Sequence, residues 1–136
     1  MPIYKRFRSY KRASRGSQSY KLTEQIAERQ TWGMCGVYWI IATLDGIEVV
    51  AYVGRSKSNI ADRLVKSMDR YSDYTHFRFR QCANELTAFR AECEEFHRYG
   101  GSDGLDNVNH PPRPGGHRGH GVMCSVKNCP LNQRYR

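Results

Sequence analysis

Two apolar runs on either side of a tight-turn signal dominate the hydrophobic pattern of the chain. Residues 36–54 are rich in β-branched and aromatic side chains, and Asp45-Gly46 in their middle favours a turn. This pattern predicts a β-hairpin. Residues 74–82 alternate between polar and apolar positions, which is typical of a third strand with Phe77 and Phe79 facing the core.

Two loop lengths are compatible with the hairpin, and they place its tyrosines differently. A two-residue loop at Asp45-Gly46 puts Tyr38 and Tyr52 on opposite faces, because side chains alternate along a strand. A three-residue loop, 44–46, pairs the two tyrosines with each other, and glycine suits its last position. We predict the longer loop because it also leaves one fully apolar face, made of Val37, Trp39, Ile41, Ile47, Val49, Ala51 and Val53.

Three segments with helical signals surround these strands. Residues 22–30 form a short helix candidate, and residues 59–69 form another that begins at Ser58 or Asn59. Residues 84–99 repeat apolar side chains at helical spacing before Gly100-Gly101. The expected fold is therefore α/β, of the α+β type, with a small central three-stranded antiparallel sheet flanked by helices.

Composition divides the chain into three parts. Residues 1–21 contain seven basic residues and no acidic one, so we expect a flexible basic arm. Residues 22–110 are expected to fold, and residues 111–136 form a tail that contains Gly, Pro, His and Cys. No apolar run is long enough to cross a bilayer and no signal peptide is visible. We therefore expect a cytoplasmic protein without a membrane partner.

The balance of basic and acidic side chains indicates which class of molecule the protein is expected to bind. Lys and Arg number 22 against 13 Asp and Glu, which gives a formal charge of +9. Such a surplus favours nucleic acid, because basic groups near phosphates release condensed counterions. The arm also carries aromatic residues that can stack on bases, among them Tyr4, Phe7, Tyr10 and Tyr20. The alternatives are a basic protein without such a partner and a merely solubilising tail.

Short motifs mark both outer ends of the hairpin. Gly36-Val37-Tyr38 and Tyr52-Val53-Gly54 stand there, Arg63 follows nine residues after the second motif, and Glu92 ends the helical segment AFRAE. In this order and spacing, over roughly residues 34–110, the sequence resembles the GIY-YIG nuclease family. The resemblance implies a metal-dependent endonuclease that hydrolyses phosphodiester bonds in DNA, with RNA a less favoured substrate. A restriction, repair, mobile-element or phage role stays open.

The resemblance implies catalytic roles for Tyr38, Tyr52, Arg63 and Glu92. Glu92 would hold one Mg²⁺ or Mn²⁺ ion, and Arg63 would bind the scissile phosphate. Tyr38 would contact or activate the attacking water, and Tyr52 would hydrogen-bond phosphate or water. Carboxylate oxygens suit these hard cations, and the guanidinium fork fits phosphate. The alternative is that these four are ordinary packing tyrosines, a helix-surface arginine and a solvated acid.

Further residues are candidates for substrate contacts. Arg55 directly follows the second motif and lies where relatives often carry a basic residue. Asn107 fits the asparagine that usually supports the site after the glutamate helix, and we favour it over Asn109.

The sequence departs from the family one turn after the arginine. Many relatives carry His or Tyr there as a base or proton relay, whereas this chain has Ser67, which is a poor base. Lys66 and His76 are candidates to substitute for it and to contact substrate, and Tyr71 and Tyr74 are further candidates for the base. The identity of the general base is therefore open.

The tail carries side chains that bind metals. A Cys-x4-Cys pair with His-x2-His upstream can form a structural zinc site, although the spacing differs from a standard finger and a mobile loop is favoured: His110, His117, His120, Cys124 and Cys129. The cysteines number five, which argues against a disulfide framework. For the whole chain, the main alternative is a non-catalytic nucleic-acid-binding module derived from the same fold. A homodimer is also compatible with the sequence.

Overall fold

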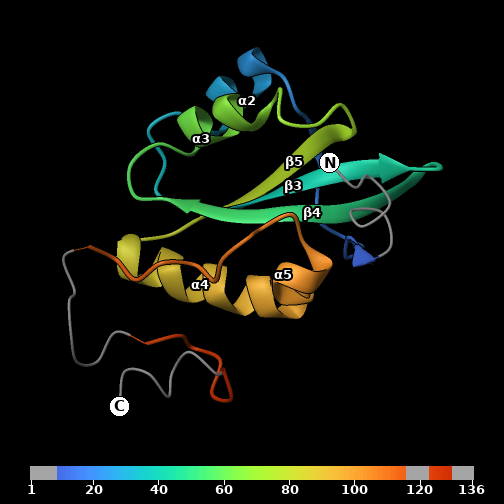
Figure 1. Ribbon diagram of the computed structural model, residues 1–136. Helices are drawn as coiled ribbons and strands as arrows, with labels where there is room; N and C mark the ends of the chain where they lie inside the picture. The colour runs from blue at the N-terminus through green and yellow to red at the C-terminus, as the bar shows by residue number, and fades with distance from the viewer. Residues whose placement is uncertain (1–8, 116–122, 130–136) are drawn as a thin grey trace.

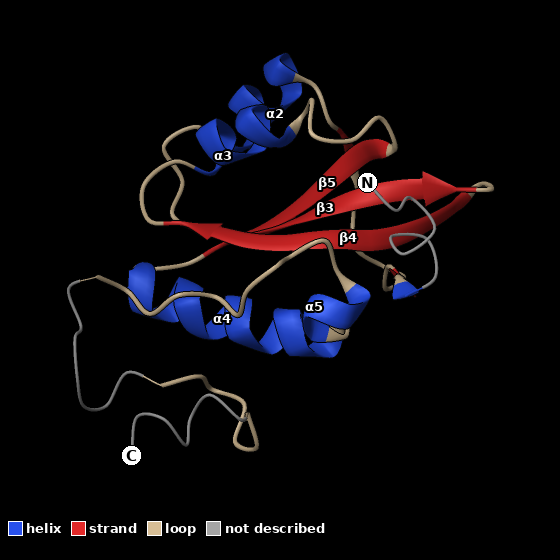
Figure 2. Cartoon of the chain, viewed as in Figure 1, coloured by secondary structure: helices blue, strands red, loops and turns tan. Residues whose placement is uncertain are grey.

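A computed structural model describes residues 9–115 and 123–129 and has an α+β fold built on one antiparallel sheet (Figures 1 and 2). The sheet has five strands, in the order β1-β4-β3-β5-β2. Its centre consists of the three strands that the sequence predicts: β3 (Gly36–Leu44), β4 (Ile47–Ser56) and β5 (Tyr74–Gln81). The two edges carry short additional strands, β1 (Lys11–Arg12) and β2 (Tyr20–Lys21).

The additional strands come from the segment that was expected to be a flexible arm. Lys11 and Arg12 pair with Val50 and Val49 of β4, and β2 pairs with β5 on the other side of the sheet. Such pairing uses backbone N–H and C=O groups, so a basic segment that buries little can still take part. Residues 9–21 therefore lie on the folded domain rather than in a separate arm, and residues 1–8 fall outside the described part.

Helices cover both faces of the sheet (Figure 1). α2 (Glu24–Thr31) and α3 (Ile60–Ser67) lie on one face, and α4 (Glu85–Arg98) with the short α5 (Gly101–Gly104) lies on the other. Asn84 caps α4, because its side chain accepts a hydrogen bond from the N–H of Thr87. Asn59 stands at the start of α3 but accepts from the N–H of Gly33 instead, which ties α3 to the chain after α2. Among the described residues, no helix has the length and apolar character that crossing a membrane requires.

The turn of the hairpin is tighter than predicted. Leu44 pairs with Ile47, so the loop consists of two residues, Asp45 and Gly46. Their φ angles of 51° and 78° both lie in the left-handed region, as a type I′ turn requires. The prediction of a three-residue loop was therefore wrong.

A β-bulge in the middle of the hairpin compensates for the tighter turn. Ile41 pairs with Val50, but Ile40 pairs with Tyr52, which leaves Ala51 as an extra residue on β4. An extra residue turns the rest of a strand over by one position. Tyr52 consequently lies on the same face as the tyrosine of the first motif, although the predicted direct pairing does not occur.

The bulge also divides the apolar side chains of the hairpin differently. Val49 and Ala51 join the core under α2 and α3 instead of the opposite core, and Ile47 is exposed. The α2–α3 side buries Tyr38, Ile40, Ala42, Ile60, Leu64 and Phe77. The α4 side buries Val37, Trp39, Ile41, Val53, Ala88 and Phe96. Near the outer end of β4 the second motif ends in Gly54, which places no side chain on either face of the sheet.

Candidate active site at the outer end of β4

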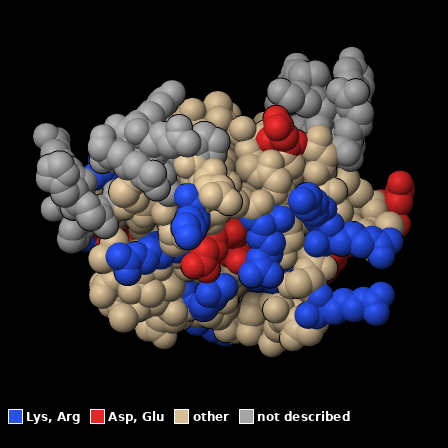
Figure 3. All heavy atoms as spheres, turned by 90° about the horizontal axis from the view of Figure 1, so that it is seen from below, with Lys and Arg blue, Asp and Glu red and all other residues tan. Residues whose placement is uncertain are grey.

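A cavity of about 230 Å³ opens at the outer end of β4. All four residues with predicted catalytic roles line it, although they come from β3, β4, α3 and α4. We call it the Tyr38–Glu92 cavity; its described lining consists of Tyr38, Tyr52, Gly54, Arg55, Lys57, Arg63, Glu85, Glu92 and Pro112. On the α4 side of the molecule, acidic atoms are surrounded by basic side chains (Figure 3). The folded chain thus brings together Tyr38 and Glu92, which are 54 positions apart in sequence.

The two tyrosines form the floor of the cavity. Their ring centroids lie 6.3 Å apart at an interplanar angle of 24°, so the rings are stacked. Tyr38 crosses directly over Gly54, where an added Cβ would lie 2.4 Å from the phenol oxygen. The guanidinium of Arg70 lies 5.7 Å from the ring centre of Tyr52, which is a cation–π distance. Gly54 is therefore needed because the phenol of Tyr38 occupies the place of its side chain.

Tyr38 is held as a neutral phenol. Burial raises its pKa far above the ordinary value, and the neighbouring Tyr52 and Glu92 raise it further, while Arg63 and Arg70 act in the opposite direction. Its side chain is only 4% exposed. This environment favours the neutral phenol, whose hydroxyl can both donate and accept hydrogen bonds.

Glu92 is a buried acid in contact with an arginine. It lies in the middle of α4, is 6% exposed, and one carboxylate oxygen is 2.7 Å from Nη1 of Arg55. Burial raises the pKa of Glu92 to about 7, while Arg55 and Arg63 lower it. Arg55 also approaches Glu85 at 3.5 Å and lies over the ring of Phe89 at 5.2 Å. Arg55, predicted as a substrate contact, thus has its guanidinium engaged by the two acids.

Arg63 lines the cavity together with Arg55 and Lys57, and among the described residues no ion pair joins it to Glu85 or Glu92. It projects from the second turn of α3, whose other side buries Ile60 and Leu64 against the sheet. Its side chain is exposed and lines the cavity, and its charge lowers the pKa values of both Tyr38 and Glu92. An exposed guanidinium beside a buried carboxylate is suited to bind an incoming phosphate.

Asn107 is bonded to the edge of the sheet beside the site. Its side-chain amide donates to the carbonyl of Val53 at 2.7 Å and accepts from the N–H of Val53 at 3.1 Å. The preceding N–H, of Asp106, donates to Ala51 at the bulge. The amide thus fixes the loop after α5 against β4, and a contact of Asn107 with substrate stays a prediction.

Two other predicted contacts lie elsewhere. Lys66 pairs with Asp62 one turn earlier on α3, at 3.1 Å, and its side chain is 70% exposed. His76 lies on β5 beside β2, and its Nδ1 is 2.9 Å from the hydroxyl of Thr75. Neither is among the described residues that line the cavity, so their role in substrate binding stays a prediction.

The cavity contains three residues that the sequence reading missed. Lys57 lies two positions after Arg55, so strand alternation could have indicated a shared side. Glu85 precedes Glu92 by seven residues, which is two helical turns and therefore the same face of α4. Pro112 approaches from the loop after α5, and no local pattern indicates that contact.

No protein-family model, curated protein or solved structure matches this chain. The chemistry of the cavity must therefore be argued from its own residues. They provide a carboxylate with a raised pKa, an exposed guanidinium, two stacked phenols and an exposed ammonium group.

Proposed function

We propose that this chain is a metal-dependent endonuclease of the GIY-YIG type that hydrolyses phosphodiester bonds in DNA. The observation that carries the proposal is that Tyr38, Tyr52, Arg63 and Glu92 line one cavity although four separate elements supply them. An α+β fold with an antiparallel sheet that has helices on both faces supports the proposal. A formal charge of +9 supports a polyanionic substrate.

The donor set fits a hard divalent cation such as Mg²⁺ or Mn²⁺. Glu92 offers carboxylate oxygens at the wall of the cavity, and Mg²⁺ is commonly held by one or two carboxylates with water completing the shell. A volume of about 230 Å³ can hold several waters, each of which takes about 30 Å³. When bound, the ion would offset the negative charge that develops on the phosphate.

The chain's own side chains would bind and orient the substrate. Arg63 would bind the non-bridging oxygens of the scissile phosphate, and Lys57 would contact a neighbouring phosphate at the mouth of the cavity. Because Tyr38 stays protonated, its hydroxyl would orient the attacking water by hydrogen bonding and would not remove the proton. The ring of Tyr52 stacks on that of Tyr38, and its hydroxyl would hydrogen-bond the phosphate or the water beside it.

Metal-dependent nicking of supercoiled plasmid tests the proposal. Wild type should nick with Mg²⁺ and lose activity with chelator, and Glu92→Ala and Arg63→Ala should each lower the rate at least about 100-fold, as loss of a transition-state contact does. Lys66→Ala is the matched control, because it changes an exposed cation on the same helix as Arg63. Equal cutting by wild type and Glu92→Ala would contradict the proposal.

The same assay separates the nuclease from the binding module. Tight DNA binding by wild type without cleavage of any strand would favour the binder. A panel of single-stranded DNA, duplex DNA, branched DNA and RNA, each with Mg²⁺ or Mn²⁺, then identifies the substrate. Faster cleavage of RNA than of every DNA substrate would contradict the assignment to DNA.

A further inference from the structure

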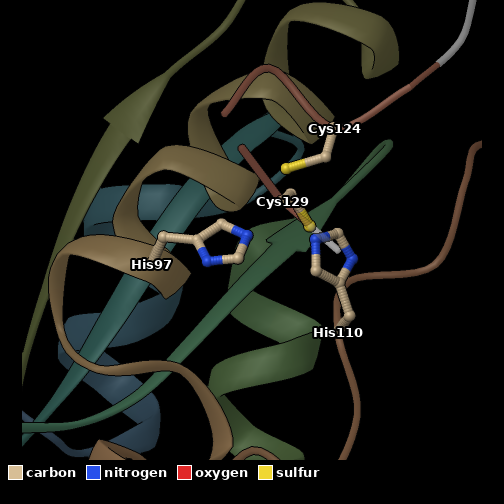
Figure 4. A group of neighbouring side chains, drawn as sticks. All are labelled: His97, His110, Cys124 and Cys129. Carbon is tan, nitrogen blue, oxygen red and sulfur yellow. The ribbon is translucent and has the colours of Figure 1, made fainter. Parts of the chain in front are cut away.

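Two histidines and two cysteines converge beside α4, apart from the Tyr38–Glu92 cavity (Figure 4). They are His97 near the end of α4, His110 in the loop after α5, and Cys124 and Cys129 in the C-terminal loop. One ligand atom from each residue lies within 4.8 Å of all the others. In a tetrahedral zinc site, neighbouring ligand atoms are about 3.3–3.8 Å apart, as follows from the usual bond lengths. A small contraction of this cluster would therefore reach that geometry.

One ring nitrogen of each histidine lacks, among the described residues, the partner that a buried polar atom normally has. Nε2 of His97 and Nε2 of His110 are both buried, and neither has a hydrogen-bond partner among the described residues. Nδ1 of His110 lies 2.9 Å from the carbonyl oxygen of Pro111, which can only accept. The proton of His110 is therefore on Nδ1, and Nε2 presents a lone pair to the cluster. This is the arrangement by which a backbone carbonyl orients a metal-binding histidine.

The electrostatics of the two histidines agree with a role as neutral ligands. Burial lowers the pKa of His97 and of His110, and His110 lowers that of His97 further. Their ring centroids are 5.3 Å apart, so two charged imidazolium rings would repel each other there. Metal binding needs the neutral imidazole.

The described part of the C-terminal loop packs beside α4 through a small set of side chains. Residues 123–129 contain no helix or strand, and their small apolar cluster consists of Phe89, Cys93, Cys124 and Cys129 with Leu86 and Val126 at its margin. The hydroxyl of Ser125 donates to the carbonyl of Arg90, and the N–H of Val126 points at the sulfur of Cys124 at 3.4 Å. All five cysteines lie within the described residues and none forms a disulfide. A loop of this kind usually needs a cross-link, and a metal ion can supply one.

We propose that His97, His110, Cys124 and Cys129 bind one structural zinc ion that fixes the C-terminal loop to α4. Two thiolates and two imidazoles in a tetrahedral arrangement suit zinc, and four protein ligands leave no open position for a substrate. His110 also lines a hollow of about 230 Å³ that includes Tyr52, Glu92 and Asn107. The zinc would thereby hold the segment from Asn107 to Pro112, which forms one wall beside Glu92.

The sequence pattern contained only part of this ligand set. His110, Cys124 and Cys129 were among the residues considered for zinc, whereas His117 and His120 lie outside the described residues. His97 was missed because it stands in a helix, 13 positions before His110, where it reads as an ordinary last-turn cation.

Metal analysis of the full chain tests the proposal independently of any cleavage. Protein produced in zinc-supplemented medium should contain one zinc per chain by mass spectrometry, and replacement by Co²⁺ should give the intense visible absorption of a tetrahedral thiolate site. His97→Asn and Cys124→Ser should each lose most of the metal. His76→Asn and Cys35→Ser are the matched controls and should keep it. Zinc well below one per chain in wild type, or full zinc in His97→Asn, would overturn the proposal.

Thiol protection in wild type gives a second test that does not depend on whether a variant folds. Cys124 and Cys129 should resist alkylation until a chelator removes the metal, and peptide mass spectrometry should then find both labelled. Labelling of both at equal rates with and without chelator would contradict the proposal. A disulfide between these two cysteines in freshly reduced protein would also contradict it.

Discussion

Gly54 shows at the scale of one residue how an absent side chain shapes the candidate site. Its missing Cβ leaves the space in which the phenol of Tyr38 crosses β4. Gly54→Ala should therefore lower the free energy of unfolding by about 1–3 kcal/mol, as overpacking of a core does. Denaturant unfolding measures this change. Gly115→Ala is the control, because nothing lies within 4 Å of an added Cβ there, and equal losses in both variants would contradict the reason given.

Glu92 determines a pH dependence of stability. Burial raises its pKa from the ordinary 4.5 to about 7, so between these values the native protein keeps a proton that the unfolded chain releases. The contribution of this group to the free energy of unfolding therefore falls as the pH rises from about 4.5 to about 7. Glu92→Gln removes this titration, so the variant should gain stability relative to wild type across that window. Thermal melts at a series of pH values measure the gap, and a constant gap would contradict the shifted pKa.

At this scale, placement in the cavity is more predictable for motif residues than for isolated ones. Tyr38, Arg63 and Glu92 all line the cavity, and each stands in a motif whose spacing relates it to a strand or helix. Lys66 and His76 were chosen only because they lie near the arginine in sequence or could carry a proton. Whether such a side chain reaches the cavity depends on helix phase and strand pairing, which single residues do not reveal.

At the scale of the element, the hairpin has its two tyrosines on the predicted face for a different structural reason. The sequence predicted two tyrosines on one face, and the structure has them there, but through a two-residue turn and a bulge at Ala51. The position of the bulge depends on the turn, on side-chain packing in the two cores and on the contacts at the edge of β4. Since those contacts come from remote residues such as Asp106, local alternation cannot predict it.

The turn offers a direct test of this register. Asp45 has a φ of 51° in the two-residue loop, and a β-branched residue is strained there. Asp45→Val should lower the free energy of unfolding by about 1–2 kcal/mol. Asp45→Asn should keep or raise it, because Asn accepts the left-handed conformation. Urea denaturation compares the two variants, and equal stability would contradict the type I′ turn.

At the scale of the whole molecule, charge was predictable from composition while its placement was not. The formal charge of +9 follows from the sequence, but the structure determines which cations face the cavity. Lys57 lines it and Lys66 does not, although both are exposed lysines close to the second motif. Lys11, Arg12 and Lys21, which were expected to lie in a flexible arm, belong to β1 and β2. They therefore add positive charge to the surface of the folded domain.

This placement predicts a difference in salt dependence. If Lys57 contacts a phosphate, Lys57→Gln should reduce the slope of log affinity against log salt by about 0.9. Lys66→Gln should leave that slope unchanged. Fluorescence anisotropy with a labelled duplex, in a Glu92→Gln background that suppresses cleavage, measures both slopes. Equal slopes for the two variants would remove Lys57 from the interface.

The amide of Asn107 has a consequence for how copies of this protein behave toward one another. β1 pairs with Val49 and Val50, and Asp106 donates to Ala51, so the peptide groups of Val53 would remain exposed at the edge of β4 if Asn107 did not bond both of them. An open sheet edge of this kind can pair with strands of other molecules. The asparagine thus imitates a peptide unit at this edge, and we expect its loss to favour strand pairing between copies.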